Sequence, residues 1–169
     1  MSILSEIADI LHDDFKCKVN YFEEKDAKMK IDIDSNGCQC LIYKYDKNLS
    51  KEYKGGLFPF FAKNAGVCKV SDYIVFAERN KALFCILVEL KRGRSQTFPQ
   101  LKAAKEFVNF VINTVNRVKG KTYKPIIRLV SIHELKIRKK KTMARTVDYD
   151  QDSHYVMSSN QFVLKYFLI

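Results

Sequence analysis

The sequence has no tryptophan and little glycine, proline or histidine, with 6, 3 and 3 residues of these types among 169. It also lacks the GxSxG, Walker and GxGxxG motifs. No apolar run approaches the roughly 20 residues that span a bilayer, and residues 1–15 carry acids where a signal peptide is basic and then apolar. Five cysteines, an odd number at irregular spacing, form no disulfide framework. We therefore expect a cytoplasmic protein that does not cross a membrane.

Acidic residues are fewer than basic residues. The chain has 30 Lys and Arg against 19 Asp and Glu, a formal net charge of +11, and 47% of its residues are hydrophobic. This hydrophobic content suffices for one folded domain over residues 1–169 and excludes a disordered or fibrous chain. The positive excess favours a polyanionic partner, although a basic run is also typical of a solvated loop. Six basic residues fall within one short stretch: Lys136, Arg138, Lys139, Lys140, Lys141 and Arg145.

The N-terminal third predicts one helix and one hairpin. Apolar residues recur at helical spacing between residues 3 and 15, and Ser2 stands at the N-cap position. The alternating segments Lys28–Asp34 and Cys38–Tyr45 flank Ser35-Asn36-Gly37, and Asn-Gly between alternating segments is a strong hairpin signal. Residues 46–66 are expected to form a loop.

The rest of the chain predicts a central sheet. Val70–Ala77 and Ala82–Leu90 form a second hairpin, whose second arm is continuously apolar, as in a strand covered on both faces. The helical spacing of residues 98–118 predicts the longest helix. Pro125–Ile132 and Gln161–Ile169 are expected strands, the latter completing the sheet or sealing a dimer. The fold class is therefore α/β with a mixed central sheet flanked by helices, in the order α-ββ-ββ-α-β-β.

Two carboxylates and one ammonium converge at the end of the predicted central strand. A hairpin turn centred on residues 80–81 places Asp72 opposite Glu89. Lys91, two residues further on, returns to the same face of the sheet. Charges at the end of an apolar strand are costly to bury, and such local conflicts are typical of functional sites.

A divalent cation would relieve the repulsion between these carboxylates. Mg²⁺, or Mn²⁺ in its place, is held by one or two carboxylates with waters and substrate phosphate, and the main-chain carbonyl of Leu90 is a further candidate ligand. Such an ion acidifies a bound water and neutralises charge on a phosphodiester. Lys91 would orient the attacking water or stabilise the phosphorane. The implied reaction is phosphodiester hydrolysis.

An Asp before a hairpin followed by Glu89-Leu90-Lys91 resembles the PD-(D/E)xK nuclease superfamily, although Ser71 replaces the proline. The resemblance covers residues 68–118 and implies a restriction-endonuclease-like core, with a helix before and a strand after. It also implies a Gln early in the following helix, for which Gln100 is the candidate and Gln96 the alternative. Glu6 is the candidate for an acid from the first helix, but its position on the helical wheel lies about 120° from the apolar stripe.

The Glu-x-Lys pattern alone is not specific, since it occurs four times in this chain. Glu134-Leu135-Lys136 also follows an apolar strand, but it is preceded by a helix. Only Glu89 and Lys91 combine an apolar strand with a preceding hairpin strand that carries an Asp. The alternative is that Asp72, Glu89 and Lys91 form a structural ion pair where the sheet meets solvent.

The resemblance implies a metal-dependent nuclease. Asp72 and Glu89 would hold the metal, Lys91 would act on the water, and Gln100 would contact either the metal ligands or the substrate. Arg92, Arg94 and the basic run at 136–145 would bind phosphates, giving salt-dependent affinity with little sequence information. DNA is the default substrate, and specificity would come from substrate shape, a homodimer or a partner protein. The alternatives are a non-catalytic nucleic-acid-binding or assembly protein on the same fold, and a component of an antiviral defence or mobile-element system.

Overall fold

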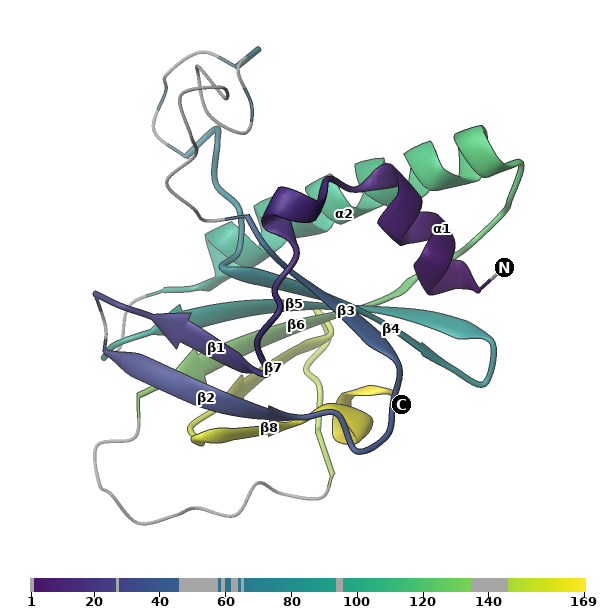
Figure 1. The fold of residues 1–169 in the computed structure, drawn as a ribbon. Coiled ribbons are helices and arrows are strands. Elements are labelled where there is room, and N and C mark those ends of the chain that lie inside the picture. The colour runs from purple at the N-terminus through teal and green to yellow at the C-terminus, as the bar shows by residue number, and fades with distance from the viewer. Residues whose placement is uncertain are drawn as a thin grey trace.

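A computed structural model describes residues 2–26, 28–45, 58, 60–61, 64, 66–93, 96–134 and 146–169. Two α-helices and eight strands, which form two mixed sheets, are shown in Figure 1. No helix within these ranges is long and apolar enough to cross a membrane. The elements in chain order are α1 (Ile3–Ile10), the 3-10 turn η1 (Asp13–Phe15), β1 (Tyr21–Glu24), β2 (Met29–Asp34), β3 (Cys40–Lys44), β4 (Tyr73–Arg79), β5 (Ala82–Lys91), α2 (Phe98–Lys119), β6 (Ile126–His133), β7 (His154–Met157), β8 (Gln161–Val163) and the 3-10 turn η2 (Leu164–Phe167).

The β4–β5 hairpin is the centre of the larger sheet and has the predicted register, with Tyr73 opposite Val88. Asn80 and Lys81 both have positive φ, which matches the tight turn that joins two twisted antiparallel strands. Alternate residues of β5 enter two different cores. Leu83, Cys85 and Leu87 pack beneath the helices, whereas Phe84, Ile86, Val88 and Leu90 pack against the smaller sheet. Burial on both faces explains the continuous apolar run.

The larger sheet changes from antiparallel to parallel at β5. Its order is β3-β4-β5-β6-β7, in which β3, β4 and β5 are antiparallel while β5, β6 and β7 are parallel. The crossover from β5 to β6 is α2, as expected for a parallel connection. This helix extends to Lys119 and ends at Gly120, which adopts the left-handed conformation at φ 63°. The larger sheet is therefore mixed, and α2 connects its antiparallel part to its parallel part.

The predicted hairpin between residues 28–34 and 38–45 is wrong. The turn exists, with Asn36 and Gly37 at positive φ and a hydrogen bond from the Cys38 N–H to the Ser35 carbonyl. However, β2 pairs with β1 and β8 in the smaller sheet, whereas β3 pairs with β4 in the larger one. Crossing between sheets lets β2 bury Met29 and Ile31 against the face of the larger sheet. Burial therefore overrode the local turn signal.

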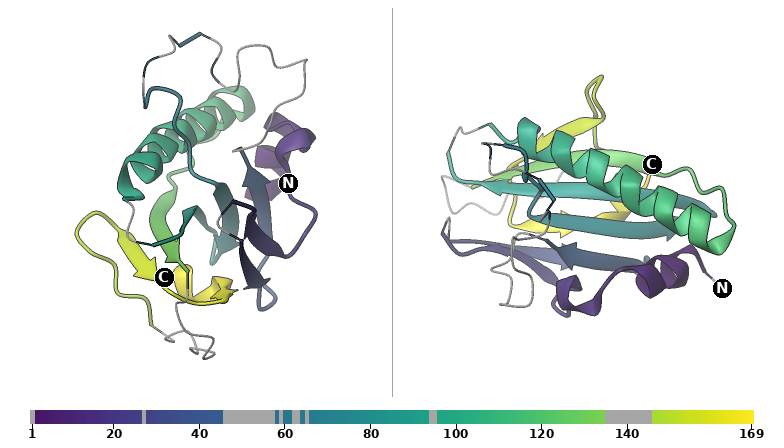
Figure 2. Two further views of the ribbon diagram at one scale, coloured as in Figure 1. Left: turned by 90° about the vertical axis from the view of Figure 1, so that its left-hand side faces the viewer. Right: turned by 90° about the horizontal axis from the view of Figure 1, so that it is seen from above.

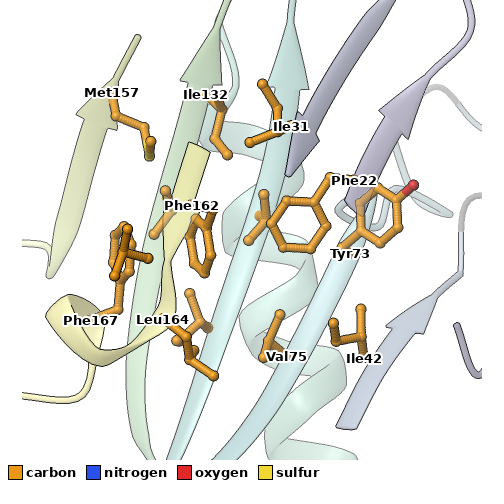
Figure 3. Packing of buried hydrophobic residues seen from close by; sticks show 14 of the residues in the cluster. Phe22, Ile31, Ile42, Tyr73, Val75, Ile132, Met157, Phe162, Leu164 and Phe167 are labelled. Atoms are coloured by element: carbon orange, nitrogen blue, oxygen red, sulfur yellow. The ribbon is translucent and has the colours of Figure 1, made fainter. Parts of the chain in front are cut away.

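The elements form three layers, as Figures 1 and 2 show. Both helices cover one face of the larger sheet, and the smaller sheet, with order β1-β2-β8, covers the other. Figure 3 shows the core between the sheets, where the rings of Phe162 and Phe167 are stacked with centroids 4.3 Å apart and Phe22 meets Phe162 edge-on. The mixed α/β class is confirmed.

Two predicted boundaries need correction, and two strands were not predicted. The first helix ends at Ile10 rather than at residue 15, because the chain continues as a separate 3-10 turn in which the His12 side chain accepts from the Asp14 N–H. Gln161–Ile169 is strand only to Val163 and then forms η2. Strands β1 and β7 were not predicted, and β8 joins the smaller sheet through β2, not the central one.

Candidate functional site

The acidic pair forms as the hairpin register predicts. Asp72 directly precedes β4 and Glu89 lies near the end of β5. The Leu90 N–H donates to Asp72 Oδ2 over 2.7 Å, and the Asp72 N–H donates to Glu89 Oε2 over 3.2 Å. Both residues are buried, at 5% and 2% exposure. The main chain therefore holds two carboxyl groups together as a buried acidic corner at the sheet end.

The Lys91 ammonium lies next to this corner, 3.0 Å from Glu89 Oε1, and its side chain is 29% exposed. Burial lowers the pKa of Lys91, but the hydrogen bond to Glu89 and the charges of Glu89, Asp72 and Glu24 outweigh it, so the pKa is raised. Lys91 is therefore a cation at neutral pH and acts as a hydrogen-bond donor, not as a base.

An open cleft of about 550 Å³ surrounds these groups. Sequence reasoning placed six of its lining residues in the site: Asp72, Glu89, Leu90, Lys91, Arg92 and Gln100. It missed five others: Glu24, Asp26, Cys68, Lys69 and Val70. The cleft therefore combines acidic residues, of which Asp72 and Glu89 are buried, with basic residues.

Gln100 is the glutamine that reaches the cleft. Its Oε1 is buried and has no hydrogen-bond partner among the residues described by the structure. Gln96, the alternative, is exposed and does not line the cleft. Glu6 is also absent from the lining, because its carboxylate accepts a 2.6 Å hydrogen bond from Tyr123 and lies 3.5 Å from the Lys121 ammonium. A buried acceptor without a donor is costly, and this one belongs to a residue of the cleft lining.

Glu24 and Asp26 reach the cleft from the β1–β2 turn of the smaller sheet. Tyr73 fixes this turn, because its hydroxyl accepts from the Glu23 N–H over 2.8 Å and donates to the Glu23 carbonyl over 3.0 Å. The Lys44 ammonium donates to the same carbonyl. The contact between Tyr73 and Glu23 joins residues 50 positions apart and leaves no local sequence pattern. Only a correct prediction of the β1–β2 pairing would have placed Glu24 and Asp26 in the site.

A buried hydrogen-bond chain supports the cleft from behind. Ser131 lies beside Glu89 in the β5–β6 register, and its Oγ is 2.5 Å from Thr97 Oγ1 and 2.7 Å from His154 Nε2. The Asp150 carboxylate accepts from the main-chain N–H of His154, and its Oδ2 lies 3.6 Å from the His154 ring Nδ1. Ser131 is fully buried, so this Ser–His–Asp succession cannot present a nucleophile to substrate. It instead ties the start of α2, and with it Gln100, to the sheet.

The predicted phosphate contacts lie partly within the described residues. Arg92 lines the cleft and forms an exposed ion pair with Glu134 at 3.1 Å. The chain leaves β6 at this same end, since the Glu134 N–H donates to the Lys91 carbonyl. The other predicted contacts lie outside the described residues: Arg94, Lys136, Arg138, Lys139, Lys140, Lys141 and Arg145.

The donor set fits a hard divalent cation that keeps part of its hydration shell. Within the described ranges, no group of three or more His, Cys, Asp or Glu side chains could hold a metal ion. Asp72 and Glu89 would supply two carboxylates and the Leu90 carbonyl is the predicted third ligand, so water and substrate would have to supply the rest, as is usual for Mg²⁺. Comparisons with protein-family models, curated proteins and solved structures found no match.

Proposed function

We propose that the chain is a metal-dependent nuclease of the PD-(D/E)xK type with a restriction-endonuclease-like core. The observation that carries this proposal is the joining of Asp72, Glu89 and Lys91 in one cleft at the end of β5. The order of elements supports it, because α1 precedes the antiparallel β3-β4-β5 unit, α2 follows, and β6 runs parallel to β5. The resemblance implies the same order.

Asp72 and Glu89, with the Leu90 carbonyl, would hold Mg²⁺ or Mn²⁺. When bound, such an ion acidifies water and offsets negative charge on the phosphodiester. Lys91 donates hydrogen bonds from its ammonium and so orients the attacking water and stabilises the phosphorane oxygens. Gln100, in the cleft lining, would contact the metal ligands or the substrate. Arg92 and Lys69 at the rim attract the phosphates on either side.

The proposed substrate is nucleic acid in the cytoplasm, with DNA as the default. The basic excess makes binding strong at low salt, and phosphate contacts carry little base information. Specificity would then come from substrate shape, a homodimer or a partner protein. A role in a defence or mobile-element system is consistent with this chemistry and is decided by genomic neighbourhood.

A second candidate function is non-catalytic binding of nucleic acid, or assembly, on the same fold. The favouring observation is the 3.0 Å ion pair between Lys91 and Glu89, because it compensates the buried carboxylate without a metal. The two functions differ in their dependence on metal. Non-catalytic binding survives EDTA, involves no cleavage and is unaffected by replacement of Asp72.

The deciding experiment compares cleavage of labelled single-stranded DNA, duplex DNA and RNA at low salt with Mg²⁺ or Mn²⁺. Asp72→Asn and Lys91→Ala are expected to lower the cleavage rate by about 100-fold or more, since each removes a group that acts on developing charge. Asp9→Asn, at an exposed carboxylate on α1, is the control and should cleave like the wild type. Binding without cleavage in all four proteins would favour the second candidate.

A further inference from the structure

Three phenylalanines form an exposed aromatic cluster outside the cleft. Phe58, Phe60 and Phe61, here called the phenylalanine trio, have ring centroids 4.7 to 6.2 Å apart. The Phe61 N–H donates to the Phe58 carbonyl, which closes a turn within the trio. Phe60 is 75% exposed and Phe61 is 46% exposed. Two adjacent rings that face water are unusual for a segment whose only role is to cover a core.

The trio is attached to the protein through one helix residue. Phe58 packs edge-on against Phe107 of α2 at 5.6 Å, and Phe107 contacts the buried Tyr45 at 4.9 Å on its other side. Tyr45 in turn stacks on Phe15. The innermost ring therefore rests on the core, and the two outer rings are presented to solvent.

The trio and the cleft lie along the same side of α2. Phe107 follows Gln100 by seven residues, which is two turns and nearly the same direction around the helix, at a separation of about 10 Å. The chain after the trio also leads to the cleft, since Cys68, Lys69 and Val70 line it. Figures 1 and 2 show the described end of this stretch, residues 66–70, leading to the start of β4. The rise of α2 from Gln100 to Phe107 corresponds to about three stacked nucleotides at 3.4 Å each.

Positive charge lies on the path from the trio to the cleft. Lys69 is exposed, follows the trio in the chain and lines the cleft. Between Gln100 and Phe107 on α2, Ala103 adds little bulk to this side of the helix. Cations beside exposed aromatic rings are the two components of surfaces that bind single strands, in which phosphates meet the charges and bases meet the rings.

We propose that Phe60 and Phe61 stack with unpaired nucleobases of a strand whose backbone enters the cleft, so that the substrate is single-stranded over this stretch. In a duplex, bases stack on one another and pair, and their faces are not available to the trio. Stacking tolerates any base, so the trio selects strandedness and not sequence. This inference rests on the proposed function for the role of the cleft, but base stacking itself requires no cleavage.

The test measures binding of the full chain to a fluorescent oligothymidine in EDTA, where metal-dependent cleavage is prevented. The double variant Phe60→Leu/Phe61→Leu keeps apolar bulk and removes the aromatic faces. Its Kd is expected to rise roughly 5- to 100-fold for each base that loses its stacking partner. The control Phe60→Tyr/Phe61→Tyr keeps the rings and should bind within about twofold of the wild type. An abasic strand with the same phosphates should bind all three proteins equally weakly.

Three results would overturn the proposal: equal oligothymidine affinity of the leucine and wild-type proteins, equal affinity for abasic and normal strands, or preference for a duplex over the single strand. A leucine variant that changes only the oligomeric state in sedimentation would assign the trio to contact between copies of the chain. Failure of the nuclease proposal has a different signature, namely no cleavage by the wild type together with ring-dependent binding. The two proposals are therefore separable.

Discussion

At the scale of single residues, Lys91 has two roles that compete. Its ammonium compensates the buried Glu89, and the same location is where a metal ion would meet the carboxylates. The folded pKa of Lys91 is raised above the ordinary 10.5. The stabilisation from this pair is therefore fully present at neutral pH and is lost only as the pH rises through the folded pKa. A metal entering the site must share Glu89 with Lys91 or displace it.

Lys91→Ala is expected to lower the free energy of unfolding by about 2–3 kcal/mol at neutral pH, because it leaves buried carboxylates without their cation. Millimolar Mg²⁺ should restore part of this loss, and should stabilise the variant more than the wild type. Urea denaturation with and without Mg²⁺ measures both effects. Lys18→Ala, at an exposed lysine, should change stability by less than about 0.5 kcal/mol. Equal Mg²⁺ effects in variant and wild type would contradict a cation site at Glu89.

Gln100→Leu separates function from stability. In the wild type, Gln100 Oε1 is a buried acceptor without a donor among the described residues. Replacement by an apolar residue of similar size should therefore leave the free energy of unfolding within about 1 kcal/mol of the wild type. Cleavage should fall by about tenfold or more, since a substrate contact is lost. Thermal unfolding and the cleavage assay provide the two readouts.

Gln96→Leu is the matched control for Gln100→Leu, because Gln96 is exposed and outside the cleft. It is expected to change neither stability nor cleavage. A marked destabilisation by Gln100→Leu would mean that the Gln100 side chain stabilises the folded protein. Its Oε1 could then no longer be counted as an unsatisfied acceptor of the cleft.

At the scale of elements, Glu6 links α1 to the segment after α2. The Tyr123 hydrogen bond lowers the pKa of Glu6, burial opposes it, and Lys121 adds to the lowering. The pKa of Tyr123 is raised to about 12, chiefly by the same bond. Because the folded pKa of Glu6 is depressed, the stabilisation is present above pH 4.5 and is lost as the pH falls through the folded value.

Tyr123→Phe should therefore be less stable than the wild type at neutral pH, and the difference should shrink as the pH falls below 4.5. Urea midpoints measured across the acidic range test this, with Tyr166→Phe as a control that keeps the wild-type pH dependence. A pH-independent difference would show that Tyr123 acts by packing and not through the Glu6 carboxylate.

Local signals predicted the elements whose partners are close in sequence. The β4–β5 hairpin and α2 follow from a tight turn, an apolar run and a C-terminal glycine, and they place Asp72, Glu89 and Gln100. The Asn36-Gly37 turn was equally visible, yet β2 and β3 separate into different sheets. A turn signal fixes a reversal of the chain, but long-range burial decides which strands pair.

At the scale of the whole molecule, the packing of the smaller sheet on the larger one completes the cleft and the core. Glu24 enters the cleft because β1 and β2 lie across the larger sheet, and β2 stays there because β8 pairs with it from the far end of the chain. The sequence left open whether residues 161–169 complete a sheet or seal a dimer. In the structure, they complete the smaller sheet and fill the core between the two sheets.

Removal of this C-terminal segment should unfold the protein. Phe162, Leu164 and Phe167 are fully buried, and Phe162→Ala alone should cost about 3–5 kcal/mol. Deletion after Asn160 removes all three, a loss of about 8–15 kcal/mol that matches the whole margin of about 5–15 kcal/mol for an ordinary domain. Circular dichroism and urea denaturation measure the loss. Ile169→Ala, at a residue 57% exposed, should be within about 0.5 kcal/mol of the wild type. A folded monomer after deletion would contradict the role of β8.

The β4–β5 hairpin also sets the order in which the residues of the site come together during folding. Asp72 and Glu89 are joined by a hairpin, which closes within about 1–10 μs, whereas the β2–β8 pairing closes a loop of more than 100 residues. The nascent hairpin therefore brings the carboxylates together before Glu24 is delivered to the cleft. A divalent cation that associates at this stage would favour the correct hairpin register, so the ion would act on folding as well as on the mature protein.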